Sequence, residues 1–322
     1  MPRSLAVAFR SHPLVFATVP PLSRASSARR AAAVTATAEL VARAPRLDAL
    51  NVPDLVDENH DGKPFYRTAE PRGYATDLAA ATGREVIVNK VVAHLPSDEA
   101  VRSWAAETIR LGIRHAVLVG GSSRFIPYPG PPVAEANALV RPILDAAEGL
   151  LGNIAIPQRT GEAHRMLAKT RAGASFFTSQ LVFDPAAITE LLRTYDRLCR
   201  GAGVRPAAVL VSLGPVGDEA DAAFVRWLGA DLPDEVEQEI LEPNGIDVGE
   251  RCIETARRVW AAVRDTVERE KLAVPIGVNV EQLSARHLGH AERLLTAIAP
   301  TLDPLDGPPP AERPRAAPPS GA

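Results

Sequence analysis

The stretch from Asn153 to Pro185, NIAIPQRTGEAHRMLAKTRAGASFFTSQLVFDP, decides the fold because it reads as strand, loop, helix, turn and strand. Residues 154–156 form a short apolar run ended by a proline, which suits a buried strand better than a helix. Residues 162–171 place apolar side chains on one helical face, and Gly173 follows where that helix should end. Residues 174–183 form a second apolar run. The stretch is therefore predicted to be one strand–helix–strand unit of a parallel sheet.

The same alternation continues on both sides of this unit. Further strand-like runs occur at residues 13–19, 47–52, 85–93, 115–119, 207–213 and 274–280. Helical patterns occur at residues 23–44, 74–81, 97–111, 133–150, 186–202, 218–228, 232–240, 248–271 and 285–299. Eight strand–helix alternations are the number that a (β/α)8 barrel needs.

A doubly wound sheet is the main competing architecture, since it also alternates strand and helix. It would be expected to carry a glycine fingerprint after an early strand, and Gly120-Gly121 follows the fourth strand without a third glycine. We therefore predict an α/β fold, a single-domain (β/α)8 TIM barrel over residues 13–303. Residues 1–12 are predicted to be a flexible leader, and the Pro-rich residues 304–322 a disordered tail.

Composition sets bounds on the class of function. The chain of 322 residues has 46% apolar and 23% charged residues and a net charge of −3, so neither nucleic acid nor an anionic membrane is expected as a partner. No run reaches the length of a membrane span. The two cysteines, Cys199 and Cys252, give no disulfide framework, which favours a reducing cytoplasmic location. Whether the chain forms a homo-oligomer is left open by the sequence.

The best candidate site lies at the end of the run 174–183. In a parallel barrel the carboxyl ends of the strands and the loops after them form the ligand-binding face. Thr178, Ser179, Gln180 and Asp184 bring polar side chains to that position. A glutamine in so apolar a strand needs a partner, because burying an unpaired amide costs about 1–3 kcal/mol. The alternative to a ligand is backbone that satisfies Gln180 at the barrel rim.

This block resembles the methylenetetrahydrofolate reductase family, whose motif reads roughly K-x-x-A-G-A-x-x-x-x-T-Q-x-F-F-D. The corresponding residues here are Lys169, Ala172, Gly173, Ala174, Ser179, Gln180, Val182, Phe183 and Asp184. A coarser resemblance covers about residues 13–300. The resemblance implies a flavin-type (β/α)8 barrel that binds folate. It also implies reduction of 5,10-methylenetetrahydrofolate to 5-methyltetrahydrofolate with NAD(P)H, within the one-carbon metabolism that supplies methionine biosynthesis.

The acid implied by the resemblance is missing. The first strand of the family reads F-E-F-F-P-P, whose glutamate protonates the folate, and the corresponding FATVPP here puts Ala17 at that position. Glu281 is the first candidate for a replacement acid and Glu58 the second. Glu281 could instead serve only as the amino-terminal carboxylate of the last helix.

Substrate contacts are expected from Gln180, Asp184 and Gln282. The resemblance implies that Gln180 hydrogen-bonds the pterin ring, since an amide pairs a donor with an acceptor. Gln282 stands in the region where the family has a folate-binding arginine.

The flavin contacts of the family are only partly kept. Asn89 falls in its His-Leu-Thr motif, and Gly120, Gly121 and Ser122 replace its Arg-Gly-Asp. Lys169 matches a contact to the ribose-phosphate region, although a solvated helix lysine is an equal alternative. These five residues are the predicted cofactor contacts, with NAD(P)H as the cofactor and FAD left open. The pattern resembles the actinobacterial branch, which is described as working without bound flavin.

No metal site is predicted, because the acidic loop after residue 53 lacks the spacing of an EF-hand and has no cysteine pair. Two other functions stay open. The barrel could bind folate for a different one-carbon reaction, or it could be a non-catalytic folate-binding or partner subunit.

Overall fold

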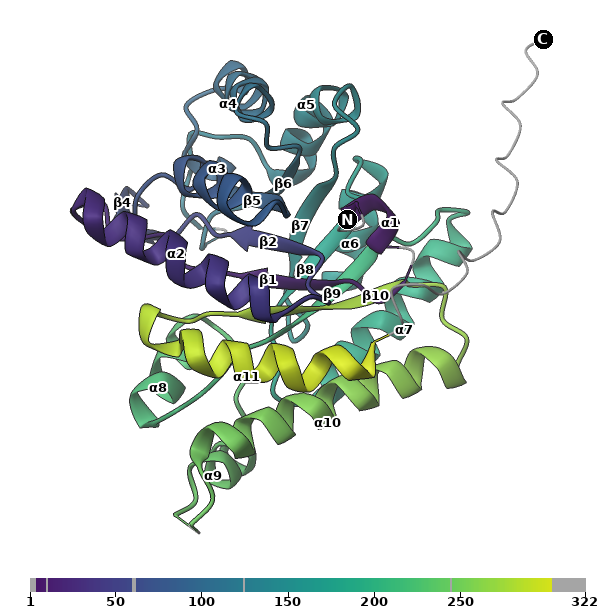
Figure 1. Cartoon of the computed structure of the whole chain (residues 1–322). Helices are drawn as coiled ribbons and strands as arrows, with labels where there is room; N and C mark the ends of the chain where they lie inside the picture. Colours follow the sequence, from purple (N-terminus) through teal and green to yellow (C-terminus); the bar gives the residue numbers. More distant parts are fainter. Residues whose placement is uncertain (1–3, 10, 60–61, 124, 244, 303–322) are drawn as a thin grey trace.

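The computed structural model describes residues 4–9, 11–59, 62–123, 125–243 and 245–302. Within these residues eight parallel strands close into a barrel in the order β1-β10-β9-β8-β7-β6-β5-β2 (Figure 1). Their bounds are β1 Leu14–Ala17, β2 Ala49–Val52, β5 Glu85–Val91, β6 His115–Val119, β7 Leu151–Ala155, β8 Phe176–Leu181, β9 Ala208–Leu213 and β10 Ile276–Glu281. The predicted (β/α)8 barrel is therefore confirmed, and each strand overlaps an apolar run identified in the sequence.

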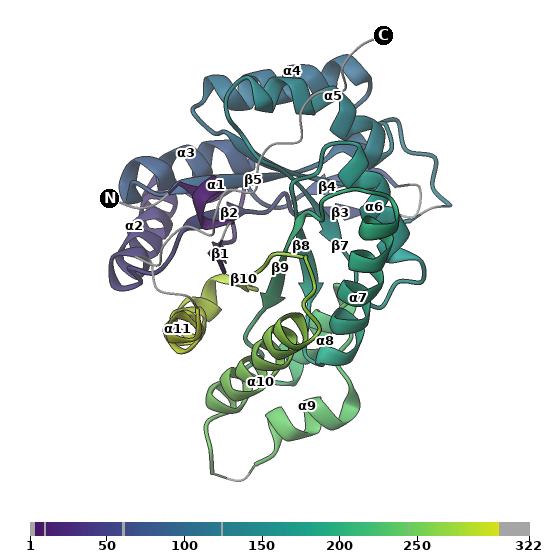
Figure 2. The same ribbon diagram turned by 90° about the vertical axis from the view of Figure 1, so that its right-hand side faces the viewer.

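Helices cover the outside of the strands in both views (Figures 1 and 2). Their bounds are α2 Ser27–Arg43, α3 Pro71–Thr82, α4 Asp98–Arg110, α5 Val133–Asp145, α6 Glu162–Arg171, α7 Pro185–Gly201, α8 Glu219–Trp227, α9 Asp234–Leu241, α10 Val248–Arg269 and α11 Leu288–Ile298. Short 3-10 helices occur at Val92–His94, Ala285–His287 and Ala299–Thr301. No helix in the described part of the chain is both long and apolar enough to cross a membrane.

The core forms two shells because side chains alternate along each strand. Leu14 and Phe16 of β1 point outward and pack in the large cluster between strands and helices. Val15 belongs to the separate cluster inside the barrel, together with Ala49, Ile87 and other strand residues. The two clusters identify the inward positions of a strand, and this alternation locates the site described below.

The amino-terminal end of the barrel is closed by the short helix α1, Leu5–Ala8. Leu5 and Ala8 are completely buried in the inner cluster, and the backbone N–H of Leu5 donates to the Glu85 carboxylate. The ring of Phe9 lies 5.0 Å from that of Phe176. The prediction of a flexible leader over residues 1–12 is therefore wrong for α1, because its two apolar side chains fill the barrel opening. The predicted tail 304–322 lies outside the described residues.

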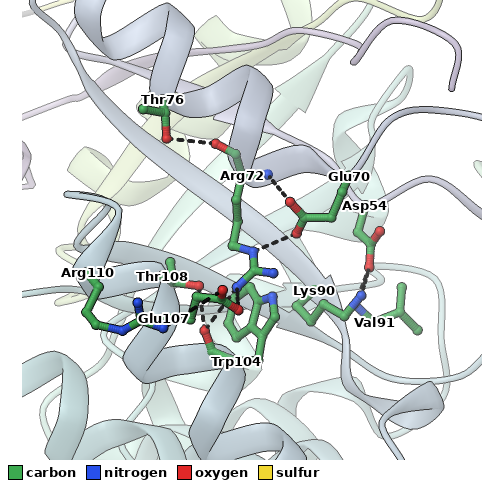
Figure 3. A network of polar contacts seen from close by, with 10 residues as sticks. All are labelled: Asp54, Glu70, Arg72, Thr76, Lys90, Val91, Trp104, Glu107, Thr108 and Arg110. Carbon is green, nitrogen blue, oxygen red and sulfur yellow. Dashed lines mark hydrogen bonds and ion pairs between the residues drawn. The ribbon is translucent and has the colours of Figure 1, made fainter.

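The loop after β2 contains a small antiparallel hairpin, β3 Val56–Glu58 paired with β4 Pro64–Tyr66. Asp54, just before β3, accepts hydrogen bonds from Lys90 Nζ at 2.9 Å and from the backbone N–H of Val91 (Figure 3). These contacts fix the start of the hairpin to the end of β5. The sequence interpretation of this region as an acidic loop therefore missed a structured element.

A second set of polar contacts drawn in Figure 3 joins α3 to α4 on the outside of the barrel. Arg72 donates to Glu70 at 2.6 Å and to Glu107 at 2.9 Å, and its guanidinium lies over the Trp104 ring (Figure 3). Because Arg72 is on α3 and Glu107 on α4, this ion pair holds the two helices together.

Candidate functional site

The inside of the barrel changes from apolar to polar toward the carboxyl ends of the strands. Asn51 and Asn89 each lie two residues beyond an inner-cluster residue, Ala49 on β2 and Ile87 on β5. Asn279 on β10 is in register with Val15, which also points inward. Parallel strand neighbours in register share a face of the sheet. The three asparagines therefore point into the barrel, and they are called the amide wall from here on.

The amide wall is buried but incompletely hydrogen-bonded. Asn51 is 3% exposed, Asn89 8% and Asn279 0%. The Oδ1 atoms of all three have no hydrogen-bond partner within the described residues. An unpaired buried amide oxygen costs about 1–3 kcal/mol, so three of them at one end of a barrel make that end the candidate site.

Glu281 lies directly beside the amide wall, at the end of β10. It is in register with Ala17 on β1, so the two side chains are on the same face of neighbouring strands. Asn279 Nδ2 donates to Glu281 Oε1 at 3.1 Å and to Ser212 Oγ at 3.0 Å. Burial raises the pKa of Glu281 to about 7, although the hydrogen bonds from Ser212 and Asn279 oppose the shift. A carboxyl group with that pKa can release a proton near neutral pH.

Glu58, the second predicted acid, sits in a different environment on β3. Its carboxylate bonds His94 Nε2 at 2.9 Å, and accepts from Ser122 Oγ at 2.5 Å and the Tyr128 hydroxyl at 2.6 Å. Burial alone would raise the pKa of Glu58, but the hydrogen bonds from Ser122 and Tyr128 and the nearby His94 outweigh it and lower the pKa. Glu58 is therefore held as an ionised carboxylate that joins three loops, so it carries no proton to donate at neutral pH.

The loop after β6, where the predicted contacts Gly120, Gly121 and Ser122 lie, packs against Tyr128. A Cβ atom added to Gly121 would lie 2.1 Å from the Tyr128 ring, so only glycine lets the ring approach. Ser122 uses its hydroxyl on Glu58 and lies 3.2 Å from the Tyr128 hydroxyl. The glycine is thus explained by local packing, which is the tight-turn interpretation of this motif.

Gln180 lies at the carboxyl end of β8, where an irregularity between Thr178 and Leu181 shifts the register with β9. Its Nε2 donates to the backbone carbonyl of Leu228 at 2.8 Å, and its Oε1 accepts from the backbone N–H of Leu181 at 3.0 Å. The backbone thus satisfies one donor and one acceptor of the amide. The position of Gln180 at the rim is as expected, while its contact with a pterin stays a prediction.

Two other predicted residues make contacts within the protein. Asp184 caps α7 by accepting from the backbone N–H of Ala186 at 2.6 Å. Gln282 accepts from the Thr18 hydroxyl at 2.9 Å, in the polar layer between β1 and Tyr74 of α3. The side chains of Asp184 and Gln282 therefore already have hydrogen-bond partners within the protein, and neither side chain is bonded to Glu281.

Lys169 donates to the backbone carbonyl of Ile154 at 2.9 Å and lies 4.0 Å from the buried Glu162 carboxylate. Burial lowers the pKa of Lys169 to about 8. The lysine is therefore not the solvated helix residue of the alternative interpretation. Its amino group ties the carboxyl-terminal part of α6 to β7.

Sequence reasoning named Asn89 and Glu281 but gave no role to Asn51, Asn279, His94 or Tyr128. A signal for two of them was present, because Asn51 and Asn279 each interrupt a short apolar strand at its carboxyl half, as Asn89 does. His94 and Tyr128 lie in loops whose course the sequence does not define. Among the described residues no group of three or more His, Cys, Asp or Glu side chains could hold a metal ion.

Two solved structures with a similar fold cover almost the whole chain. One is an uncharacterized protein from Clostridium thermocellum that binds two copies of 5-methyl-5,6,7,8-tetrahydrofolic acid. It is 17% identical with a TM-score of 0.73 and covers 92% of this chain and 98% of that chain. The other is apo-MsnO8, 16% identical with a TM-score of 0.53, covering 92% and 99%. No protein-family model and no curated protein matches the sequence. At these identities the similarity establishes the fold alone.

Proposed function

We propose that this barrel binds a reduced folate and reduces 5,10-methylenetetrahydrofolate to 5-methyltetrahydrofolate with NAD(P)H. The motif from Lys169 to Asp184 supports it through its resemblance to methylenetetrahydrofolate reductases. The similar barrel from Clostridium thermocellum, which binds 5-methyltetrahydrofolic acid, supports the folate class of ligand.

The observation that carries the proposal is the placement of Glu281. The reductase resemblance puts the proton donor at Ala17, where no acid remains. Glu281 is the register partner of Ala17, and neighbouring strands are only about 4.8 Å apart. Compared with the reductase pattern, the proposed proton donor therefore lies one strand away on the same face of the sheet. Its pKa of about 7 leaves a large fraction protonated at neutral pH, as a general acid requires.

The reaction balances with the groups named. The protonated carboxyl of Glu281 gives its proton to N10, and the bond between N10 and the methylene carbon breaks to leave a 5-iminium ion. NAD(P)H then transfers a hydride, with its two electrons, to the exocyclic carbon, which becomes the methyl group. NAD(P)+ and 5-methyltetrahydrofolate leave, and the Glu281 carboxylate recovers a proton from water. The protein supplies the orientation of the two rings and the proton.

We propose that hydride passes directly from the nicotinamide, without flavin. A flavin would supply two-electron relay chemistry, but three of the five residues at its expected contacts serve other partners in this chain. Ser122 is bonded to Glu58, Lys169 to the carbonyl of Ile154, and Gly121 is covered by the Tyr128 ring. This set does not fit the contacts that the resemblance implies for FAD.

The test is anaerobic oxidation of NADH and NADPH with 5,10-methylenetetrahydrofolate, followed at 340 nm with and without added FAD. We expect turnover that added FAD does not raise. Absence of turnover with both nicotinamides, with or without FAD, would rule out the reductase.

The second candidate is a folate-binding barrel that serves another one-carbon reaction or acts as a non-catalytic subunit. Ala17 favours it, because the acid of the reductase resemblance is absent from its own position. The same experiment separates the two when binding of 5-methyltetrahydrofolate is measured in parallel by calorimetry. Binding without nicotinamide oxidation would favour the second candidate.

A further inference from the structure

We infer that the amide wall, Asn51, Asn89 and Asn279, binds the hydrogen-bonding edge of the pterin ring. The inference rests on the proposed folate ligand and assigns the part of the site that would recognise it. None of these contacts follows from the motif at Gln180, which lies on β8 at another part of the rim.

The first argument is the arrangement of the strands. In the barrel order, β10, β1, β2 and β5 are consecutive neighbours. Asn51, Ala17 and Glu281 are register partners across three of these strands. Two strand spacings separate Asn51 from Glu281, about 10 Å between backbones. Ala17, which lies between them on β1, has only a methyl group. The smallest side chain of the three register partners therefore lies between the Asn51 amide and the proton donor Glu281.

Part of the opposite side of the barrel is apolar. β6 lies four strands from β10 in the closed order, and β7 lies four strands from β1. Their inward residues near the carboxyl ends, Val119 and Ile154, pack against the inner cluster and are partly exposed. A flat ring would therefore meet amides on one side and hydrocarbon from β6 and β7 on the other, next to the inward hydroxyl side chains of Thr178 on β8 and Ser212 on β9.

The chemistry of the wall selects the kind of ligand. All three unpartnered atoms are carbonyl oxygens, which require N–H or O–H donors. An anion such as phosphate or a carboxylate brings only acceptors and leaves these oxygens unpaired. The 2-amino-4-oxo edge of a tetrahydropterin carries three N–H bonds, two at the 2-amino group and one at N3. The isoalloxazine of a flavin carries one N–H, at N3. Three acceptors therefore match the pterin better than either.

Ordered water is the alternative occupant, since buried waters commonly satisfy otherwise unpaired polar groups. The two cases predict different effects of an asparagine-to-leucine substitution on the stability of the ligand-free protein. If the asparagines hold water as part of the scaffold, their removal destabilises the protein. If they wait for a ligand, leucine removes an unpaired polar group and leaves the ligand-free protein as stable or more stable.

The test uses Asn51→Leu and Asn89→Leu in the full-length chain, with 5-methyltetrahydrofolate as the probe. We expect the Kd from calorimetry to rise about tenfold for each variant, as expected for one lost buried hydrogen bond. The Tm of the ligand-free variants should be unchanged or higher. A 2-desamino-2-methyl analogue of the probe should bind more weakly to the wild type and lose less affinity from the substitutions.

Asn153→Leu is the matched control. Asn153 is also a fully buried asparagine on a barrel strand, but it pairs with Asn137 of α5 on the outer side at 2.7 Å. Its Tm should fall while its Kd stays at the wild-type value. An unchanged Kd in both wall variants would overturn this inference and leave the reductase proposal standing. A wild type that does not bind the probe at all would overturn both.

Discussion

The two ends of this barrel differ in the side chains that fill their inward positions. At the amino-terminal end, α1 inserts Leu5 and Ala8 into the inner cluster, and the Glu85 carboxylate accepts from the backbone N–H of Leu5. At the carboxyl-terminal end the inward positions of β10, β2 and β5 carry amides and a carboxyl group, and three amide oxygens have no partner among the described residues. The amino-terminal end is closed by the protein's own side chains. The carboxyl-terminal end keeps polar groups that a ligand could pair.

From this difference we expect residues that matter for stability to lie at the amino-terminal end and residues that matter for ligand binding to lie at the carboxyl-terminal end. Substitutions at the closed end should change the free energy of unfolding and leave ligand binding alone. Substitutions at the open end should do the reverse, because unpaired polar groups destabilise a fold and persist where a ligand uses them. The predictions below test that separation.

The largest effect is expected for turnover in Glu281→Gln. Loss of a general acid typically costs about 100- to 10,000-fold in rate, and glutamine keeps the shape without a transferable proton. Because the pKa of Glu281 is raised to about 7, wild-type kcat should fall as the pH rises through 7, whereas residual turnover in the variant should lose this dependence. Glu254→Gln on the exposed face of α10 is the control. A wild-type pH profile in Glu281→Gln would remove Glu281 from the mechanism.

Leu5→Ala should have the largest effect on stability. Removing a fully buried leucine costs about 2–5 kcal/mol, measurable by urea unfolding. Affinity for 5-methyltetrahydrofolate should stay at the wild-type value, since α1 lies at the opposite end of the barrel. Val7→Ala is the control on the same helix, because Val7 is 47% exposed. If Leu5→Ala is as stable as Val7→Ala, α1 does not close the barrel in solution.

Glu281 should also make stability depend on pH in a specified direction. Its pKa is raised from 4.5 to about 7 in the folded protein, so the folded state binds more protons than the unfolded state between these values. Stability therefore falls as the pH rises from about 4.5 to 7, by about 2–3 kcal/mol in total. Glu281→Gln should remove this decline, so that the variant is more stable than the wild type at pH 8. Parallel curves from urea unfolding at pH 5, 6, 7 and 8 would contradict the raised pKa.

The sequence predicted the barrel well because strand and helix periodicity are local properties. The helix at residues 162–171 has the predicted bounds, and all eight strands overlap their predicted runs. α1 was missed because its stability comes from Leu5 docking into strands that are distant in the sequence. The hairpin β3–β4 was missed for a similar reason, since Glu58 is held by His94 and Tyr128 from other loops.

The site was only partly predictable. The family motif pointed to Gln180, Asp184 and Lys169, whose side chains are bonded to backbone within this chain. The amide wall has no motif, because its members come from three separate strands. Their common feature is an asparagine at an inward position, and inward positions are defined only when the barrel register is known. Glu281 was chosen as an acid near a strand end, and its pairing with Ala17 needed the closed barrel.

The smallest effect is expected for Gln180→Ala, at the border between scaffold and site. Loss of its hydrogen bonds to Leu228 and Leu181 should lower the free energy of unfolding by about 1 kcal/mol. If the amide also contacts the pterin, the Kd of 5-methyltetrahydrofolate should rise about fivefold or more. Gln158→Ala is the matched control, since Gln158 donates to the neighbouring carbonyl of Gly229 at 2.9 Å from an exposed position. Equal loss of stability in both variants without a change in Kd would show that Gln180 only anchors the segment after α8, leaving pterin recognition to the amide wall.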